Sequence, residues 1–492
     1  MARVEPAGGR PFPPGDYPVV VVGSGPGGLQ TSYFLSRRGV EHAVISADDA
    51  PGGMFRAFPI FGRLLSWTKP DAPAERGTRE YEWYDHNSLS GDEPAHRATV
   101  VDFMDRSYAV PARSEMEQGI AAFAERTGVR VRYGCRWEST RREDDGSLTL
   151  VTSDGEYRCR VAVFAVGVTD PWRGAIPGIE DVPHYVESRP GHEYRGKRVL
   201  VIGKRNSAFE LADGLLPWAR RVVLVSPRPV QTAVLAFSSV RVRYMQPLED
   251  AGLGGGTLAL DAAVERIERT AAGVRVVAHG TTRPGEIVLE ADEAIAATGF
   301  RTPLRDLETL GCATVAQGRI PALTPWWESA TSSGIYFAGN ATQGAAGLRK
   351  HGVGASSAAV HGFRYNAEVL ARRIAEHHFG LTERPRPVGD LVGFLAGELA
   401  RAPELWAQKA YLARVVRLDA GAHDAGVRPL AAFLDEPGPD AVAATVETNA
   451  AADIYPVLYV RRRGEVREHV LDADAVHAFD AAGYRRAIEA VL

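Results

Sequence analysis

The sequence predicts an α/β protein with two Rossmann-like dinucleotide-binding domains and a C-terminal α+β extension. A continuous apolar, β-branched run at 17–22 leads directly into a glycine-rich turn and a helical stretch. The same succession of strand, turn and helix returns about 180 residues later, from Arg198 onward. An apolar run of this kind is typical of a strand buried on both faces of a parallel sheet. Two such units in one chain predict two nucleotide sites, or one site and a degenerate copy.

The first turn has the spacing GxGxxG, with Gly23, Gly25 and Gly28. In such a turn the first glycine allows the tight bend, the second lets the backbone approach a pyrophosphate, and the third lets the helix pack on the strand. Free N–H groups at the start of the helix then hold the phosphates. The next strand ends at Ser46 where an acidic residue is expected, and Asp48 is near enough to bind the ribose instead.

The second turn is less regular, because Arg205 and Ala208 stand where glycines are expected and only Gly203 is kept. The Cβ of Arg205 limits the approach of the backbone, so we expect looser binding or a direct contact of its guanidinium with the phosphates. The following strand ends at Ser226, and Arg228 comes two residues later. A serine and an arginine at this point favour NADPH over NADH. The alternative is a unit kept only for packing.

Each unit is followed by a buried strand that ends on a glycine turn, at Gly167 and at Gly299. A further strand in 334–340 also ends on a glycine-bearing turn, with Gly339 and Asn340. A long helix is expected from Ser356 to about His377, closed by Gly380. These repeats support the pairing of two related units in one chain.

Composition and charge narrow the possible partners. The 57 basic and 61 acidic residues give a net charge of −4, so no net field favours nucleic acid or a membrane surface. Three cysteines, Cys135, Cys159 and Cys312, form no CxxC pair, which argues against a disulfide framework, a structural zinc and a dithiol centre. No stretch approaches the ~20 apolar residues of a membrane span, and the N-terminus lacks an apolar signal segment. We expect a cytoplasmic protein without a metal site.

Several segments resemble the flavin-containing (class B) monooxygenases and the related FAD-dependent oxidoreductase domain proteins. The likeness covers roughly residues 17–375. The segments that carry it are Gly52-Gly53-Met54-Phe55, Leu64-Leu65-Ser66-Trp67-Thr68-Lys69, Asp85-His86-Asn87-Ser88-Leu89, Gly203 to Glu210, Arg349-Lys350 and His361-Gly362-Phe363-Arg364-Tyr365.

The resemblance implies two cofactors, FAD and NADPH, and an order of reaction. NADPH reduces FAD, the reduced flavin captures oxygen as a C4a-(hydro)peroxyflavin, and this adduct oxygenates a nitrogen, sulfur or carbonyl carbon of a small molecule. N-hydroxylation and Baeyer–Villiger-type oxygenation are the expected reaction types. Two alternatives stay open: a flavin reductase or dehydrogenase that inserts no oxygen, and a flavin-binding scaffold whose nicotinamide site has decayed.

Three residues are candidates for catalysis. Relatives often carry an asparagine in the loop before a lysine, near the reactive face of the flavin, whereas here Thr68 precedes Lys69. Asn87 is the other amide available, and His351 precedes the helix whose N-terminus is expected to face the flavin. His351 is as much an acid–base candidate as a structural histidine. The predicted cofactor-binding residues are Gly23, Gly25, Gly28, Ser46, Gly53, Met54, Gly203, Arg205, Asn206, Ser207, Arg228, Gly299, Gly339 and Asn340.

The domain limits follow from these assignments. We expect a disordered lead-in at 1–16, an FAD-binding domain in two pieces, 17–195 and 296–384, and an NADPH-binding domain at 196–295. The extension at 385–492 follows a Pro/Arg-rich linker and carries no motif with a recognisable chemistry. Its default interpretation is packing or dimerisation, so a homodimer is a possible assembly.

Overall fold

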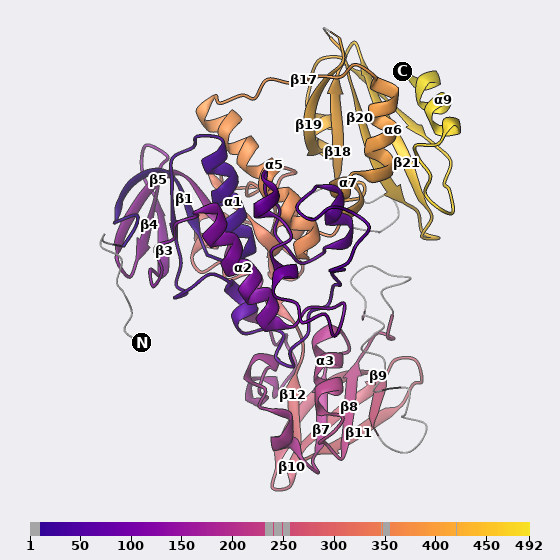
Figure 1. Cartoon of the computed structure of the whole chain (residues 1–492). Helices are drawn as coiled ribbons and strands as arrows, with labels where there is room; N and C mark the ends of the chain where they lie inside the picture. Colours follow the sequence, from indigo (N-terminus) through magenta and orange to yellow (C-terminus); the bar gives the residue numbers. More distant parts are fainter. Residues whose placement is uncertain are drawn as a thin grey trace. The chain divides into compact units, whose positions relative to one another are not determined.

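A computed structural model describes residues 10–231, 240, 248, 256–345, 347, 355–419 and 421–492. The chain folds into two compact units, and each is built from segments that are distant in sequence (Figure 1). The domain limits expected from the sequence stay predictions. The first unit takes in Met1–Arg56, Ser66–Val168 and Thr302–Leu492, and the second takes in Ala57–Leu65 and Thr169–Arg301.

The first unit contains a sheet whose central strands are parallel. Its order is β2-β1-β5, with β16 on the other side of β5 and an antiparallel extension through β4 and β3. Val19 to Val22 are nearly inaccessible to solvent, as the apolar run predicted. The α/β fold class is thereby confirmed. The strands are β1 Gly15–Val22, β2 His42–Ile45, β3 Trp137–Arg142, β4 Leu148–Thr152, β5 Gly155–Phe164 and β16 Ile335–Phe337.

Three long helices accompany this sheet. Helix α1 has Pro26 in its first turn, where the missing N–H costs nothing. Helices α2 and α5 end at Gly128 and Gly380, both in the left-handed conformation that glycine adopts without strain. Helix α5 begins at Val360 rather than at Ser356, because Ala359 before it has extended backbone angles. The helices span Pro26–Arg37 (α1), Arg113–Thr127 (α2) and Val360–Phe379 (α5).

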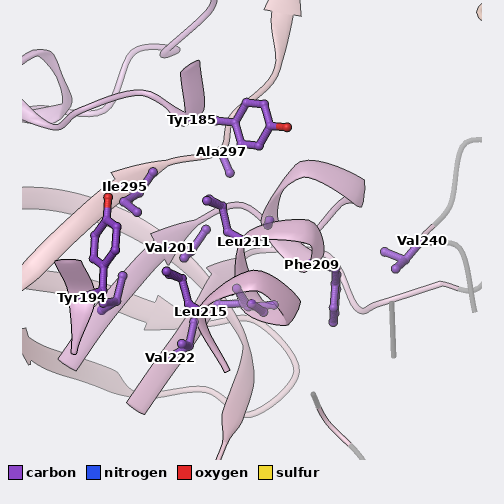
Figure 2. Packing of buried hydrophobic residues seen from close by; sticks show 14 residues of the cluster. Tyr185, Tyr194, Val201, Phe209, Leu211, Leu215, Val222, Val240, Ile295 and Ala297 are labelled. Atoms are coloured by element: carbon purple, nitrogen blue, oxygen red, sulfur yellow. The ribbon is translucent and has the colours of Figure 1, made fainter. Parts of the chain in front are cut away.

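The second unit repeats the parallel core on a smaller scale. The strand order is β11-β10-β9-β8-β7-β12, in which β7, β8, β9 and β12 run parallel. One face is covered by helix α3, Asn206–Leu215, whose Leu211 and Leu215 pack in one cluster with Val201 and Val222 (Figure 2). The strands are β7 Arg198–Ile202, β8 Arg221–Ser226, β9 Thr257–Thr270, β10 Gly273–Gly280, β11 Glu286–Ala291 and β12 Glu293–Ala296.

The C-terminal extension is a separate antiparallel sheet of order β17-β19-β18-β20-β21-β22 within the first unit. One face packs against helices α6 and α9, and the other packs against α8. Among the described residues no helix is long and apolar enough to cross a membrane. The elements are β17 Arg386–Pro387, α6 Leu391–Arg401, α7 Pro403–Ala407, β18 Leu412–Arg417, β19 His423–Pro429, α8 Leu430–Asp435, β20 Ala441–Thr448, β21 Ile454–Arg462, β22 Glu465–Val470 and α9 Ala482–Val491.

Candidate nucleotide sites

The first glycine turn is packed too tightly to hold side chains. Gly23 has φ +114°, and a Cβ there would lie 2.5 Å from the carbonyl oxygen of Ala165, at the end of the neighbouring strand. A Cβ on Gly28 would overlap the carbonyl oxygen of Gly23. The turn is held by the Gly23 amide, which donates to Ile45 at 2.8 Å. Helix α1 can therefore start directly above the strand, with its free amides at the turn.

Two further glycine-bearing segments meet this helix start. A Cβ on Gly53 would lie 2.8 Å from the Cα of Gly25, and a Cβ on Gly27 would lie 2.5 Å from the Cα of Gly339. The short helices Gly53–Arg56 (η1) and Gly339–Gly344 (η11) thus each approach the start of α1 backbone to backbone. Predicted binding residues from three distant segments are brought together here. A cradle of bare backbone at a helix N-terminus fits a pyrophosphate.

A carboxylate lies beside this cradle, at the end of strand β2. Ser24 Oγ lies 2.9 Å from Ser46 Oγ and 3.2 Å from Asp48 Oδ2, and Ser46 Oγ lies 3.3 Å from the same carboxylate oxygen. Asp48 is half-buried. A carboxylate with two hydroxyls at this edge of the sheet fits ribose recognition. Met54 and Asn340 are half-buried in η1 and η11, next to Gly53 and Gly339.

The second glycine turn has the same geometry as the first. Gly203 has φ +135°, and a Cβ there would overlap the carbonyl oxygen of Ala297. Its amide donates to Val225 at 2.8 Å, as Gly23 donates to Ile45. The replacement of glycine by Arg205 leaves the turn intact. Arg205 is exposed to solvent, and its backbone carbonyl still accepts a hydrogen bond from the amide of Phe209 at 3.0 Å. Helix α3 starts directly after this turn with Asn206 and Ser207, and the backbone amides at a helix start are the groups that bind phosphate.

An ion pair beside the end of strand β8 was not predicted from the sequence. The buried side chain of Lys204 pairs with Asp261, which also accepts a 2.7 Å hydrogen bond from Thr282. Asp261 lies in β9, directly opposite Ser226 of β8. Hydrogen bonds from Lys204 and Thr282 lower the pKa of Asp261 below its ordinary value. A carboxylate is therefore present beside Ser226, and it is neutralised by a lysine from the glycine turn.

The catalytic candidates Thr68 and Asn87 are directly hydrogen-bonded. Asn87 Nδ2 donates to Thr68 Oγ1 at 2.9 Å and to the carbonyl of Ser66 at 2.9 Å. Thr68 Oγ1 in turn donates to Asp85 Oδ1 at 2.9 Å. All three side chains are buried, and Asp85 Oδ2 has no hydrogen-bond partner within the described part of the chain. An unsatisfied buried oxygen of this kind is a place where a donor group of a bound molecule could be accommodated.

The segment that carries Asp85 and Asn87 is fixed by a buried arginine. Arg364 in α5 donates to the carbonyls of Glu82, Asp85 and Ser88 at 2.8–3.1 Å. His86 stacks on His361, with ring centroids 4.8 Å apart. The segments 85–89 and 361–365, which carried the family resemblance, are thus in contact.

The remaining predicted residues are more scattered. Gly299 lies in the second unit, where its carbonyl accepts the amide of Trp172 at 3.0 Å and lies 3.0 Å from His184 Nε2. Burial lowers the pKa of His184 below its ordinary value. Arg228 is exposed after the end of β8. His351 lies outside the described residues.

Comparison with known proteins identifies the family. The family model of the pyridine nucleotide-disulphide oxidoreductases matches residues 20–339, which include both glycine turns. The chain belongs to this family. It is an enzyme family of oxidoreductases, so this membership supports the flavoprotein resemblance recognised in the sequence.

Two relatives carry the name FAD-dependent oxidoreductase domain-containing protein 2. The protein of Danio rerio is 31% identical over 226 residues, covering 43% of this chain and 31% of its own length. That of Mus musculus is 26% identical over 440 residues, covering 81% of this chain and 64% of its own length. The chain therefore spans less than two thirds of either relative.

A solved flavin-containing monooxygenase from Stenotrophomonas maltophilia has a similar fold. It superimposes with a TM-score of 0.56 at 18% identity, covering 74% of this chain and 99% of the monooxygenase. At this identity the likeness concerns the fold alone. It confirms the α/β architecture with Rossmann-like domains.

Proposed function

We propose that the chain is an FAD-dependent, NADPH-reduced monooxygenase that acts on a small molecule. The proposal rests on the shared geometry of the two glycine turns. At both Gly23 and Gly203 a Cβ would overlap a neighbouring carbonyl oxygen, and the amide donates to the end of the next strand. One chain with two such turns has a place for an electron donor and a place for the group that receives the electrons.

FAD is assigned to the first unit. The amides at the start of α1, with Gly25, Gly53 and Gly339 around them, would hold the pyrophosphate, and Asp48 with Ser46 would bind the ribose. When bound, FAD supplies the capacity to take electrons from NADPH and to activate oxygen. The residues of this chain provide binding, orientation and a buried surrounding.

NADPH is assigned to the second unit. The start of α3 would meet the pyrophosphate, while Arg205 and Arg228 are the cations available to its phosphates. The pairing of Asp261 with Lys204 supports a 2′-phosphate here, because it removes the charge that would repel one.

Oxygen is the acceptor that the side chains favour over a disulfide. The three cysteines lie far apart in the sequence, and all three are buried and unpaired. A dithiol relay to a disulfide substrate needs two neighbouring cysteines. Oxygenation places one oxygen atom in the substrate and releases the other as water, with two electrons supplied by NADPH. N-hydroxylation and Baeyer–Villiger-type oxygenation are the proposed reactions.

A non-oxygenating reductase is the second candidate, and the hydrogen bonding of Thr68 and Asn87 favours it. The Thr68 proton goes to Asp85, and both N–H bonds of Asn87 are directed to Thr68 and Ser66. In this arrangement neither side chain offers a free donor to an oxygen-derived group. The retained geometry of the Gly203 turn argues against the third alternative, a scaffold with a decayed nicotinamide site.

One experiment separates the three. FAD-loaded protein is mixed with NADPH without oxygen, and oxygen is then added together with amines, sulfides or ketones. Monooxygenase activity predicts bleaching of the flavin absorbance by NADPH and an oxygenated product in about equal amount to the NADPH consumed. Formation of hydrogen peroxide in an amount equal to the NADPH consumed, with every substrate tried, would support the reductase. No bleaching would support the scaffold.

A further inference from the structure

The C-terminal extension reaches the segment in front of helix α5 through one buried side chain. Gln408, which follows α7, is fully inaccessible to solvent. Its Nε2 donates to Asn366 Oδ1 at 2.6 Å and to Ser357 Oγ at 3.1 Å. Ser357 Oγ also lies 3.3 Å from Gln408 Oε1. In the described part of the chain, every hydrogen bond of this side chain leaves the extension.

The contacts continue from there to the first glycine turn. Asn366 Nδ2 donates to Thr342 Oγ1 at 3.0 Å and to Ser357 Oγ at 3.1 Å. Thr342 Oγ1 donates to the carbonyl of Gly339 at 2.6 Å. Gly339 is the residue whose backbone lies against Gly27 at the start of α1. A continuous path of buried polar contacts therefore runs from Gln408 to the glycine turn.

Backbone contacts fix the same segment. The amide of Ser356 donates to the carbonyl of Ala407 at 3.1 Å. Gly362, in the first turn of α5, lies so close to the carbonyl of Ser356 that a Cβ would overlap it. Ser356 is thus held between the extension on one side and the helix on the other. A buried amide network of this type is rigid when every partner is present and costly when one is removed.

We propose that Gln408 is a positioning residue for the FAD site, and that the extension is a structural part of that site. The inference rests on the proposed binding of FAD to the first unit. Gln408 orients Asn366, Asn366 orients Thr342, and Thr342 holds the Gly339 turn against the start of α1. Loss of Gln408 should loosen this turn and weaken the binding of FAD, although no atom of Gln408 is needed to touch the cofactor.

The test compares two variants of the whole chain. Gln408→Met keeps the length of the side chain and removes its donors and acceptor. Thr445→Val is the matched control, because Thr445 is buried in the extension and donates to the Leu412 carbonyl at 2.8 Å, within the extension's own sheet. Three quantities are measured on each: the Kd for FAD, the midpoint potential of the bound flavin, and the midpoint of thermal unfolding.

The expected result is a Kd raised roughly tenfold or more in Gln408→Met, with a shifted midpoint potential. Thr445→Val should lower the unfolding midpoint to a similar extent but leave both flavin quantities unchanged. If Gln408→Met does not fold, Ser357→Ala removes the neighbouring contact, and it should raise the Kd in the same direction.

The contrary results are distinct. One is a folded Gln408 or Ser357 variant that binds FAD with a Kd within twofold of wild type and keeps the midpoint potential within a few millivolts. This result would overturn the inference and leave the proposed function standing. Equal losses of FAD affinity in Gln408→Met and Thr445→Val would reduce the effect to general stability, and would overturn it too. A wild-type chain that takes up no FAD would overturn the proposed function together with the inference.

Discussion

The backbone of Gly23 packs directly on the carbonyl oxygen of Ala165, which would lie 2.5 Å from a Cβ at position 23. The two residues directly follow the neighbouring parallel strands β1 and β5, and Gly23 is the first residue of the glycine turn. Gly203 and Ala297 repeat this relationship in the second unit. The contact explains why a side chain is excluded at the first position of both turns.

Alanine substitutions at Gly23 and Gly203 should distinguish the binding site of FAD from that of NADPH. Gly23→Ala combines steric overlap with a strained φ, at a cost of order 1–3 kcal/mol, and should weaken FAD binding about tenfold or more. Gly203→Ala should leave FAD bound and weaken NADPH binding by a similar factor. Equilibrium titrations with FAD and with NADP+ measure both. Gly483→Ala is the control, since a Cβ there meets nothing within 4 Å; loss of FAD in Gly203→Ala would contradict the assignment.

Arg228→Ala should raise the KM for NADPH more than the KM for NADH. A charge-assisted contact to the 2′-phosphate contributes about 1.5–3 kcal/mol, so the selective loss should be roughly 10- to 100-fold. Steady-state kinetics with both nucleotides test it. Arg221, exposed at the opposite end of the same strand, provides the control substitution. An equal rise in both KM values would remove the proposed role of Arg228.

Lys204→Met should shift the nucleotide preference toward NADH. The substitution leaves the Asp261 carboxylate without its cation, at the strand end where a 2′-phosphate would bind. The KM for NADPH should rise about tenfold relative to that for NADH. Adding Asp261→Asn should restore most of the preference, because the double variant no longer carries an unpaired charge. A double variant as impaired as Lys204→Met alone would speak against this electrostatic explanation.

How much of this could be read from the sequence depends on how local each feature is. The glycine turns and their strands are contiguous, so the apolar run at 19–22 and the spacing of Gly23, Gly25 and Gly28 predict them directly. Asp261 was missed because it comes from β9, a strand that no motif links to the Gly203 turn. Only tertiary structure could bring these residues together.

The C-terminal extension shows the same limit. Its helical stretches and hairpin-like runs predict an α+β fold, which the structure confirms, but nothing in the sequence connects Gln408 with Asn366. Thr68 and Asn87 were predicted as separate candidates, and their mutual hydrogen bond depends on how two loops meet. The sequence predicts a start of α5 at Ser356, four residues before the observed start at Val360. Polar residues in front of a helix do not distinguish a preceding turn from the first helical turn.

Acid should destabilise the contact between the extension and the rest of the first unit. Glu398 accepts two 2.8 Å hydrogen bonds from Arg79 and one of 2.7 Å from Arg414. Burial raises the pKa of Glu398, but the two arginines outweigh it and lower the pKa to about 2, against an ordinary 4.5. A depressed carboxyl pKa stabilises the fold fully above pH 4.5, and this contribution is lost as the pH falls from there toward 2.

Glu398→Gln should accordingly lower the free energy of unfolding by about 3 kcal/mol at pH 7, because Arg79 and Arg414 lose a buried partner. The difference from wild type should shrink as the pH falls below 4.5. Urea unfolding at several pH values measures both effects. Glu465→Gln removes one partner of an exposed pair with Arg467 and should change little at any pH. A Glu398 effect that is constant from pH 7 to pH 3 would contradict the argument.

We propose that one chain binds two different dinucleotides, at two turns of the same construction. Calorimetric titration of the purified, flavin-free chain with FAD, followed by NADP+, tests it most directly. We expect one FAD per chain, and then one NADP+ whose binding is lost in Gly203→Ala while FAD remains. A chain that takes up no FAD and stays colourless when the cofactor is offered would contradict it.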